Sequence, residues 1–320
     1  LSHSVVLPPI FFTGFIFAFL APTGPNAWMY YYVCFILYCL AMGFIIPIWT
    51  DFLAHIFPRE NRGHYLGISF ACNSIGGFAG GIIVKILLNS SIPFPNNFGW
   101  GFIIMGISMG LGTLVYLFYN VGNKTDKTPH KTIAVFWQDT KNIIKSHVNF
   151  RRYLLSRILI TAHFPAMSLY AVYTQELFGF NISEAGVFIV LQVITFSLGS
   201  VASGKIGDHW GHKTAIIFSF SGYLLAIIFT IFATSMIHVY AIFLSLGLGH
   251  GGFMPSAMNM VYEFAESRDS KIYMALIDTF LAPFVLLMII GASVLDPIIG
   301  TRNLFVLAGF LIAIGLLLLT

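Results

Sequence analysis

The sequence predicts an all-α integral membrane protein with about ten transmembrane helices. Composition is the first reason: 58% of the 320 residues are hydrophobic and only 9% are charged, whereas a soluble domain carries roughly a quarter charged residues. The second reason is that apolar runs of about 20 residues, each long enough to cross the hydrocarbon core as a helix, recur along the chain. The formal charge of +4 therefore concerns membrane topology and lipid contact, and we expect no nucleic-acid partner.

The apolar runs place ten candidate spans in chain order. These lie at about 5–20, 27–53, 65–88, 99–120, 152–176, 183–203, 214–233, 237–262, 271–291 and 302–320.

Lysine and arginine residues are unevenly distributed, which is the third reason. Fourteen of the sixteen lie in, or just after, one set of alternate loops. This set is 58–64, 121–151 with Arg152 and Arg157 just after it, 204–213 and 264–271. Because cytoplasmic loops carry such an excess, we expect these loops and both ends of the chain to lie in the cytoplasm. The protein would be a multi-pass protein of the cytoplasmic or plasma membrane.

The loop 121–151 is longer than the others and divides the chain. It contains several lysines together with Phe136 and Trp137. A basic loop with embedded aromatic residues suits a segment that lies partly on the cytoplasmic face of the membrane, and simple connection of two bundles is the alternative. In either case the loop separates residues 1–120, with four spans, from residues 152–320, with six spans.

An internal repeat supports this division. Gly43 stands four residues before Pro47 in the second span, and Gly251 stands four residues before Pro255 in the eighth, at an offset of 208 residues. Duplicated halves with glycine and proline in matching helices are characteristic of secondary transporters. If the eighth span repeats the second, one unit has six spans, and we expect two further helices before Leu1.

The stretch Gly204–Lys213 is a dense polar segment between two long apolar runs. It reads Gly-Lys-Ile-Gly-Asp-His-Trp-Gly-His-Lys and fits the pattern G-x-x-x-D-x-x-G-x-[RK]. Gly204 and Gly211 would let the chain reverse tightly between two membrane helices. Asp208 would lie near a helix end, where a carboxylate can meet an N-terminal dipole or a neighbouring cation. An ordinary solvated turn is the alternative.

In these features the chain resembles the major facilitator superfamily of secondary transporters. The pattern at Gly204–Lys213 is similar to the family's loop signature in its C-terminal copy, and Arg62-Gly63 resembles the turn into the family's fifth helix. The resemblance covers essentially the whole chain, read as helices three to twelve of an N-terminally truncated transporter. It implies a two-bundle fold with about ten of an expected twelve helices, and we expect a monomer.

The resemblance also implies a cytoplasmic gate, which breaks when the inner side of the transporter opens. Its expected residues are Gly204, Asp208, Gly211, Lys213 and Arg268, with a second cytoplasmic turn at Arg59, Arg62 and Gly63.

A second family pattern, the efflux signature G-x8-G-x3-G-P-x2-G-G, is only partly present in the third span. Gly67, Gly76 and Gly80 match it, whereas Gly81 replaces the proline and the last two glycines are missing. We interpret the glycines from Gly76 to Gly81 as close packing between helices, and proton antiport is the alternative. The direction of transport stays open.

Ionisable residues inside membrane spans are functional candidates, because charge is costly in hydrocarbon. His163 and His250 lie near the middle of the fifth and eighth spans, which the resemblance places along the family's central cavity, and Asp278 lies about two turns into the ninth span. The candidates for contact with solute or protons are His163, Tyr170, Gln192, His250 and Asp278.

Each of these residues has a structural alternative. Either imidazole could exchange a proton with the cavity, since histidine titrates near neutral pH, or it could hold a fixed hydrogen bond between helices. For Asp278, pairing with Lys271 or Arg268 is the interpretation that we adopt over substrate contact.

The sequence contains no recognisable catalytic or cofactor pattern. A Walker-type phosphate loop is missing, and His209 and His212 have no cysteine or acidic cluster with metal geometry. We expect the three cysteines, Cys34, Cys39 and Cys72, to be small buried hydrophobic residues. The chain is therefore expected to be neither an enzyme nor a binder of a cofactor or metal.

The predicted function is secondary active transport of a small solute through the lipid bilayer by alternating access, with protons as a candidate coupling ion. The alternative is a membrane sensor or scaffold that retains the transporter fold without transporting. The sequence does not identify the solute.

Overall fold

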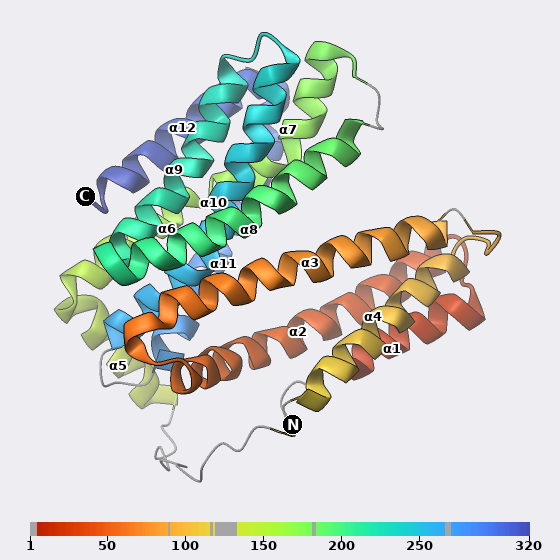
Figure 1. The fold of residues 1–320 in the computed structure, drawn as a ribbon, viewed down its shortest axis with the longest axis horizontal. Helices are drawn as coiled ribbons and strands as arrows, with labels where there is room; N and C mark the ends of the chain where they lie inside the picture. Colours follow the sequence, from red (N-terminus) through yellow and green to blue (C-terminus); the bar gives the residue numbers. More distant parts are fainter. Residues whose placement is uncertain (1–4, 89, 116–117, 119–132, 181–183, 266–269) are drawn as a thin grey trace. The chain divides into compact units, whose positions relative to one another are not determined.

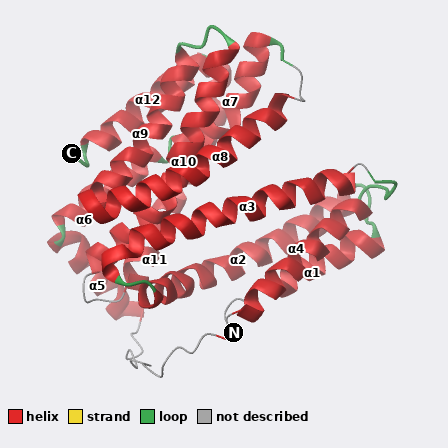
Figure 2. Ribbon diagram, in the orientation of Figure 1, coloured by secondary structure: helices red, strands yellow, loops and turns green. Residues whose placement is uncertain are grey.

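Every regular element in the described part of the chain is a helix (Figures 1 and 2). The computed structural model describes residues 5–88, 90–115, 118, 133–180, 184–265 and 270–320. Its elements are α1 (Leu7–Phe15), the π-helical turn η2 (Ile16–Leu20), α2 (Pro25–Ile56), the 3-10 turn η3 (Arg59–Asn61), α3 (Arg62–Leu88), α4 (Asn96–Val115), α5 (Ile133–Ser146), α6 (Val148–Ile160), α7 (His163–Phe178), α8 (Glu184–Trp210), α9 (His212–Ile231), α10 (Met236–Ala265), α11 (Ser270–Ile299) and α12 (Thr301–Leu317). The all-α prediction is confirmed.

The helices account for all ten predicted spans. Eight helical segments of the described chain are long and apolar enough to cross a membrane, and α6 and α7 together form one of them. The first and last predicted spans correspond to shorter apolar helices, Leu7–Leu20 and Thr301–Leu317. The structure therefore agrees with a multi-pass membrane protein.

The predicted loop 121–151 contains the helix α5. Thr140 and Ile143 are buried on one side of this helix, whereas Trp137, Lys141 and Lys145 are exposed. This spacing of three and four residues places each set on its own face. The segment is thus amphipathic and helical from Ile133 onward, and the residues before it lie outside the described part.

Close contacts group the chain into two compact units. One contains Leu1–Phe52 and Gly77–His130, and the other contains Leu53–Gly76 and Lys131–Thr320. The division into bundles at 1–120 and 152–320 stays a prediction.

In the first unit, α1 and η2 pack against α4 through small residues. An added Cβ at Gly99 would lie 2.5 Å from the Cα of Ala18, so the two backbones can approach only because position 99 lacks a side chain. Asn96 Nδ2 donates a 2.7 Å hydrogen bond to the carbonyl of Ala18, which satisfies an acceptor near the end of the helix.

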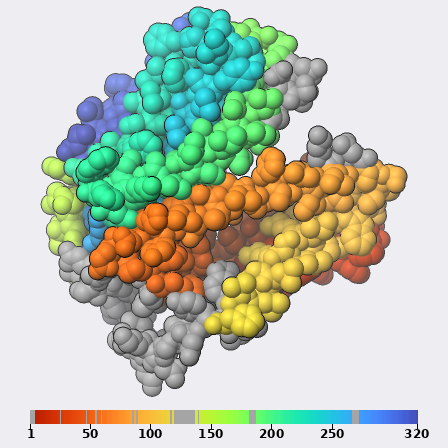
Figure 3. Space-filling model, in the orientation of Figure 1, coloured from red at the N-terminus to blue at the C-terminus, as the bar shows by residue number. Residues whose placement is uncertain are grey.

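In the second unit, α8, α9 and α10 lie side by side and form a closely packed surface (Figures 1 and 3). Ser200 Oγ donates to the carbonyl of Gly251 at 2.8 Å, and Ser203 Oγ donates to the carbonyl of Gly252 at 2.7 Å. Small residues and hydroxyl bonds of this kind hold helices together where lipid removes the hydrophobic drive between them. The Gly251–Pro255 element predicted from the repeat is part of this packing.

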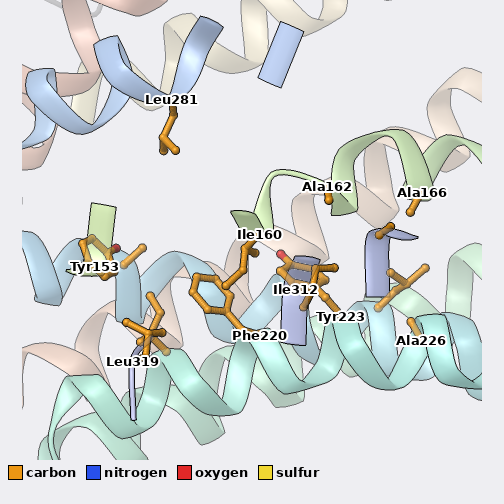
Figure 4. Packing of buried hydrophobic residues seen from close by; sticks show 14 of the residues in the cluster. Tyr153, Ile160, Ala162, Ala166, Phe220, Tyr223, Ala226, Leu281, Ile312 and Leu319 are labelled. Carbon is orange, nitrogen blue, oxygen red and sulfur yellow. The ribbon is translucent and has the colours of Figure 1, made fainter. Parts of the chain in front are cut away.

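The main hydrophobic core belongs to the same unit. Figure 4 shows the side chains of Ile160, Phe220 and Ile312 meeting between α6, α9 and α12. Each of the three is at most 2% exposed. Burial fixes the relative positions of the helices that carry the site described below.

The cysteines differ from the expectation of burial. Cys34 is buried, but Cys39 and Cys72 are exposed. The expectation is therefore wrong for these two, because their helix faces point away from the described neighbours.

Candidate functional site

The carboxylate of Asp208, near the end of α8, binds the first turn of α3. The N–H of Gly63 donates to Oδ1 at 2.9 Å, and the N–H of His64 donates to Oδ2 at 2.7 Å. Backbone donors in a first turn lack helical acceptors, and the helix dipole favours negative charge there. Asp208 therefore caps a helix that lies 145 residues away in the sequence.

Asp208 reaches α3 because the two helices approach closely through small residues. A Cβ added at Gly63 would lie 2.6 Å from the carbonyl oxygen of Gly204, and one added at Gly67 would lie 2.5 Å from that of Ser200. Both pairs are four residues apart, so the contact follows one face of each helix. This is the small-xxx-small arrangement of tightly packed membrane helices.

This contact changes the interpretation of the stretch Gly204–Lys213. Residues up to Trp210 continue α8 and His212 begins α9, so the chain reverses at Gly211, whose φ is +87°. The prediction of a tight turn is confirmed for Gly211. It is wrong for Gly204, which lies within α8 and makes room for the backbone of α3.

Arg62 contacts the same region from another side. Its Nε and Nη2 donate to the carbonyl of Phe57 at 3.4 and 3.3 Å, and its guanidinium lies over the ring of Tyr262 in α10, 4.7 Å from the centroid. Lys213 Nζ donates to the carbonyl of Thr320 at 3.2 Å. Arg268 and the side chain of Arg59 lie outside the described residues.

The remaining glycines of α3 are those that the sequence analysis interpreted as close packing between helices. A Cβ added at Gly76, Gly77, Gly80 or Gly81 would meet no described atom within 4 Å. For these four positions the packing interpretation stays a prediction. Among the glycines that match the efflux pattern, Gly67 makes a close contact, with Ser200.

The fifth predicted span is broken between α6 and α7, and Pro165 explains the break. Proline has no N–H and clashes with the carbonyl four residues earlier, so a regular helix cannot continue past Thr161. The N–H of Phe164 bonds instead to Thr161 at 3.0 Å, which leaves the carbonyl of Ile160 without its helical donor. His163 Nδ1 lies 2.7 Å from that carbonyl and, in the tautomer with hydrogen on Nδ1, donates to it.

The imidazole of His163 is held in place by aromatic rings. It stacks on Tyr223 with a centroid distance of 4.3 Å and an interplanar angle of 14°, and the ring of Phe164 lies 4.2 Å away. The residue is only 8% exposed. A buried histidine that caps a broken membrane helix is thus fixed beside the cavity described next.

A cavity of about 240 Å³ lies beside the break. Three ionisable side chains from three helices line it: Arg157 of α6, His163 of α7 and Asp278 of α11. The rest of the lining is Ile160, Thr161, Phe164, Phe220, Phe253, Leu281, Ala282 and Val285. A mainly apolar cavity with a few converging polar groups has the composition of a small-molecule site.

Arg157 is the residue that the sequence analysis missed. We counted it with the cationic loops, but it lies nine residues after the start of α6 at Val148, about 13 Å along the helix. Its Nη1 donates to Tyr153 Oη at 2.9 Å, and its guanidinium lies 4.6 Å from the ring centroid of Phe253. The signal was available, since the predicted span 152–176 already included Arg157.

The structure places Asp278 in the lining of the same cavity as Arg157. Its predicted partners are Lys271 and Arg268. The side chain of the first and the whole of the second lie outside the described residues, so this pairing stays a prediction.

The other predicted cavity residues do not line this cavity in the described part of the chain. Tyr170 is buried and stacks on Phe305 at 5.1 Å, and its hydroxyl has no hydrogen-bond partner among the described residues. Nδ1 of His250 also has no hydrogen-bond partner among the described residues, and the ring of His250 lies 6.5 Å from that of Tyr223. Gln192 lies on α8, and its backbone carbonyl faces Gly247 of α10. Their contact with a solute stays a prediction.

The fold and this arrangement define a multi-pass helical membrane protein with a small amphipathic cavity and a capped contact between distant helices. The family can then be stated. The chain belongs to the Major Facilitator Superfamily, whose profile matches residues 5–280 and 153–320. Because this is a family of membrane transporters and not of enzymes, the prediction that the chain is not an enzyme is confirmed.

Two curated relatives share parts of the sequence. The niacin transporter NiaP of Acinetobacter baylyi is 27% identical over 127 residues, which cover 40% of this chain and 29% of the relative. The tetracycline resistance protein, class H, of Pasteurella multocida is 26% identical over 181 residues, which cover 53% and 42%. The chain thus spans less than half the length of either relative.

Solved structures share the fold over nearly the whole chain. A bacterial homologue of the iron transporter ferroportin in an outward-facing state has a TM-score of 0.70 at 14% identity, covering 99% of this chain and 82% of the other. The fucose:proton symporter FucP of E. coli has a TM-score of 0.70 at 10% identity, covering 99% and 83%. At these identities the likeness concerns the fold alone.

Proposed function

We propose that the chain is part of a secondary active transporter that moves a small solute across the membrane by alternating access. Membership in the family supports this function, and the contact of Asp208 with the start of α3 carries it. Alternating access requires contacts that close one side of the membrane and break when that side opens. One carboxylate that holds a helix through two backbone N–H groups is such a contact, because few bonds must be exchanged to release it.

The gate is proposed to lie on the cytoplasmic side, because the excess of Lys and Arg predicts that the turn at Gly211 is cytoplasmic. Asp208 forms the bond, Gly63 and Gly204 allow the helices to meet, and Arg62 braces the turn from the side of Tyr262. Arg59, Lys213 and Arg268 are assigned to the same gate on the sequence pattern. The protein is proposed to act as a monomer in the cytoplasmic or plasma membrane.

The relatives support a small organic solute without selecting one. They are named for niacin, for tetracycline and, in a further relative from Pseudomonas aeruginosa, for 4-hydroxybenzoate. Protons are the candidate coupling ion, and His163 and Asp278 are the candidate groups for exchanging them.

Reconstitution into proteoliposomes tests the function. Uptake of radiolabelled niacin, 4-hydroxybenzoate and tetracycline is measured with and without a pH gradient, against empty liposomes. Flux of any of them above that background is the expected result. Binding without flux would favour the alternative, a membrane sensor or scaffold.

Asp208→Ala and Asp208→Asn test the gate in the same assay. Both should lower flux per reconstituted molecule by about tenfold or more, since a hydrogen bond to a charged group contributes about 1.5–3 kcal/mol. His209→Ala is the control, because this neighbouring side chain is exposed and its hydrogen bond among the described residues lies within α8, to the carbonyl of Lys205 at 3.0 Å. Equal flux in Asp208→Ala and His209→Ala would remove Asp208 from the gate.

A further inference from the structure

The cavity beside the break between α6 and α7 has a chemical character that defines its ligand more narrowly than a small solute. We infer that it binds a small organic carboxylate with a flat apolar body, that Arg157 anchors the carboxylate, and that Asp278 takes up a proton as the anion binds. This inference rests on the proposed transport function and names the substrate class of the same protein.

Arg157 is prepared to bind an anion. Its Nη1 is held by Tyr153 Oη at 2.9 Å, and its plane is supported by the ring of Phe253, with 4.6 Å from Cζ to the ring centroid. A guanidinium fixed in this way loses little conformational freedom when it binds. Its planar arrangement of N–H donors matches the two oxygens of a carboxylate.

The remaining lining selects the body of the ligand. Phe164, Phe220 and Phe253 contribute aromatic surface from three helices, and Leu281 and Val285 contribute aliphatic surface from α11. Aromatic faces favour a flat apolar group. A sugar would leave most of its hydroxyls unpaired here, because apart from the three ionisable groups only Thr161 adds a polar side chain to the lining. The volume of about 240 Å³ suits a small ligand.

Charge balance inside the membrane links the anion to a proton. Arg157 and Asp278 compensate each other when no anion is bound, and an uncompensated charge at this depth is costly. A ligand carboxylate at Arg157 adds a second negative charge to the cavity, and two carboxylates that share one site do not both stay ionised. If Asp278 accepts one proton and becomes a carboxylic acid, the net charge of the cavity is unchanged and no other reactant is needed.

Among the described residues that line the cavity, Arg157 is the one permanent cation. Besides Asp278, the described titratable residues in the lining are Arg157 of α6 and His163 of α7. Tyr153 bonds to Arg157, Tyr223 of α9 stacks on His163, and His250 of α10 lies beside Tyr223. His163 uses Nδ1 to cap Ile160, so this nitrogen does not contact the ligand. Within the described lining, Arg157 is therefore the permanent positive charge for which Asp278 and the ligand compete.

Calorimetric titration of the purified protein with benzoate tests the anion site directly. Benzamide is the neutral compound of the same shape, and acetate is the carboxylate without the flat body. Benzoate should bind saturably, and both other compounds should bind at least about tenfold more weakly. Arg157→Gln should weaken the affinity for benzoate by at least about tenfold, because truncating one partner of a charge pair is that costly. Arg157→Lys should lower this affinity by less.

The proton is measured by repeating the titration in buffers that differ in ionisation enthalpy. The protein should take up one proton for each benzoate, and affinity should fall as pH rises. Asp278→Asn should still bind benzoate but abolish both the proton uptake and this pH dependence. Thermal unfolding of Arg157→Gln, Arg157→Lys and Asp278→Asn shows whether each variant is folded.

The outcomes separate this inference from the transport function. Failure of benzoate to bind, equal affinity for benzamide, or an unchanged affinity in folded Arg157→Lys and Arg157→Gln would overturn the anion site, even if another solute is transported. Binding with no proton uptake would overturn the role of Asp278. Binding of benzoate without flux of any solute would support the anion site and overturn the proposed transport function.

Discussion

Gly63 leaves room for the carboxylate of Asp208: its N–H donates to Oδ1 at 2.9 Å, and an added Cβ would lie 2.5 Å from the same oxygen. One position therefore supplies both the bond and the space for it. Glycine at the start of α3 and aspartate near the end of α8 depend on each other, although each alone looks like an ordinary turn residue.

Gly63→Ala should break this contact without changing any charge. The added methyl group must displace Asp208 or separate the backbones of α3 and α8, so the hydrogen bonds from Gly63 and His64 are lost together. We expect amide hydrogen exchange in the first turn of α3 to become at least about tenfold faster, since each bond to a charged acceptor contributes about 1.5–3 kcal/mol.

Gly76→Ala is the matched control for this prediction. It places the same methyl group on the same helix, where no described atom lies within 4 Å. Exchange in the first turn should stay as in the wild-type chain. Equal acceleration in both variants would mean that the methyl group acts on α3 as a whole and not on Asp208.

The fold was predictable because long apolar runs in the sequence mark the membrane helices. Apolar runs located every helix from α1 to α12 except α5, because the lysines of that amphipathic helix resemble a loop. The close approach of α3 to α8 was not predictable. Gly204 and Gly211 look alike in the sequence, and only the path of α3 shows that the first serves a helix contact and the second serves the turn.

The candidate site was predicted in part. His163 and Asp278 were identified because ionisable residues are rare in apolar spans, and the structure brings them to one cavity. Arg157 was assigned to topology because a cation near a loop is usually a positive-inside residue. Its orientation toward Phe253 depends on the packing of α6 against α10, which no local pattern in α6 encodes.

Ser200→Ala and Ser203→Ala should each loosen the packing of α8 on α10. Their hydroxyl groups donate to the carbonyls of Gly251 and Gly252 in the neighbouring helix. Hydrogen bonds between membrane helices contribute about 0.6 kcal/mol on average and up to about 1.7 kcal/mol, so each variant should lower the free energy of unfolding by that order. Chemical denaturation in mixed micelles measures the change.

Ser197→Ala is the control on the same helix. Its hydroxyl bonds within α8, to the carbonyl of Val193 at 3.3 Å, so no bond between helices is lost. A loss of stability as large as that of Ser200→Ala would show that the effect comes from α8 itself and would contradict the assigned role of the interhelical bonds.

Tyr170→Phe should keep or raise stability, and its flux tests the predicted contact of Tyr170 with the solute. The ring of Tyr170 is 1% exposed and stacks on Phe305, and its hydroxyl has no partner among the described residues. An unpaired buried polar group costs about 1–3 kcal/mol, and phenylalanine removes this cost without changing the packing.

Tyr153→Phe is the contrasting variant, because it deprives Arg157 Nη1 of its acceptor and should weaken both the fold and anion binding. Thermal unfolding and flux, measured on both variants, show whether each hydroxyl acts on stability or on transport. If Tyr170→Phe unfolds normally but loses flux, its hydroxyl contacts the solute or a proton, and the cavity extends along α7 beyond the lining of Arg157, His163 and Asp278.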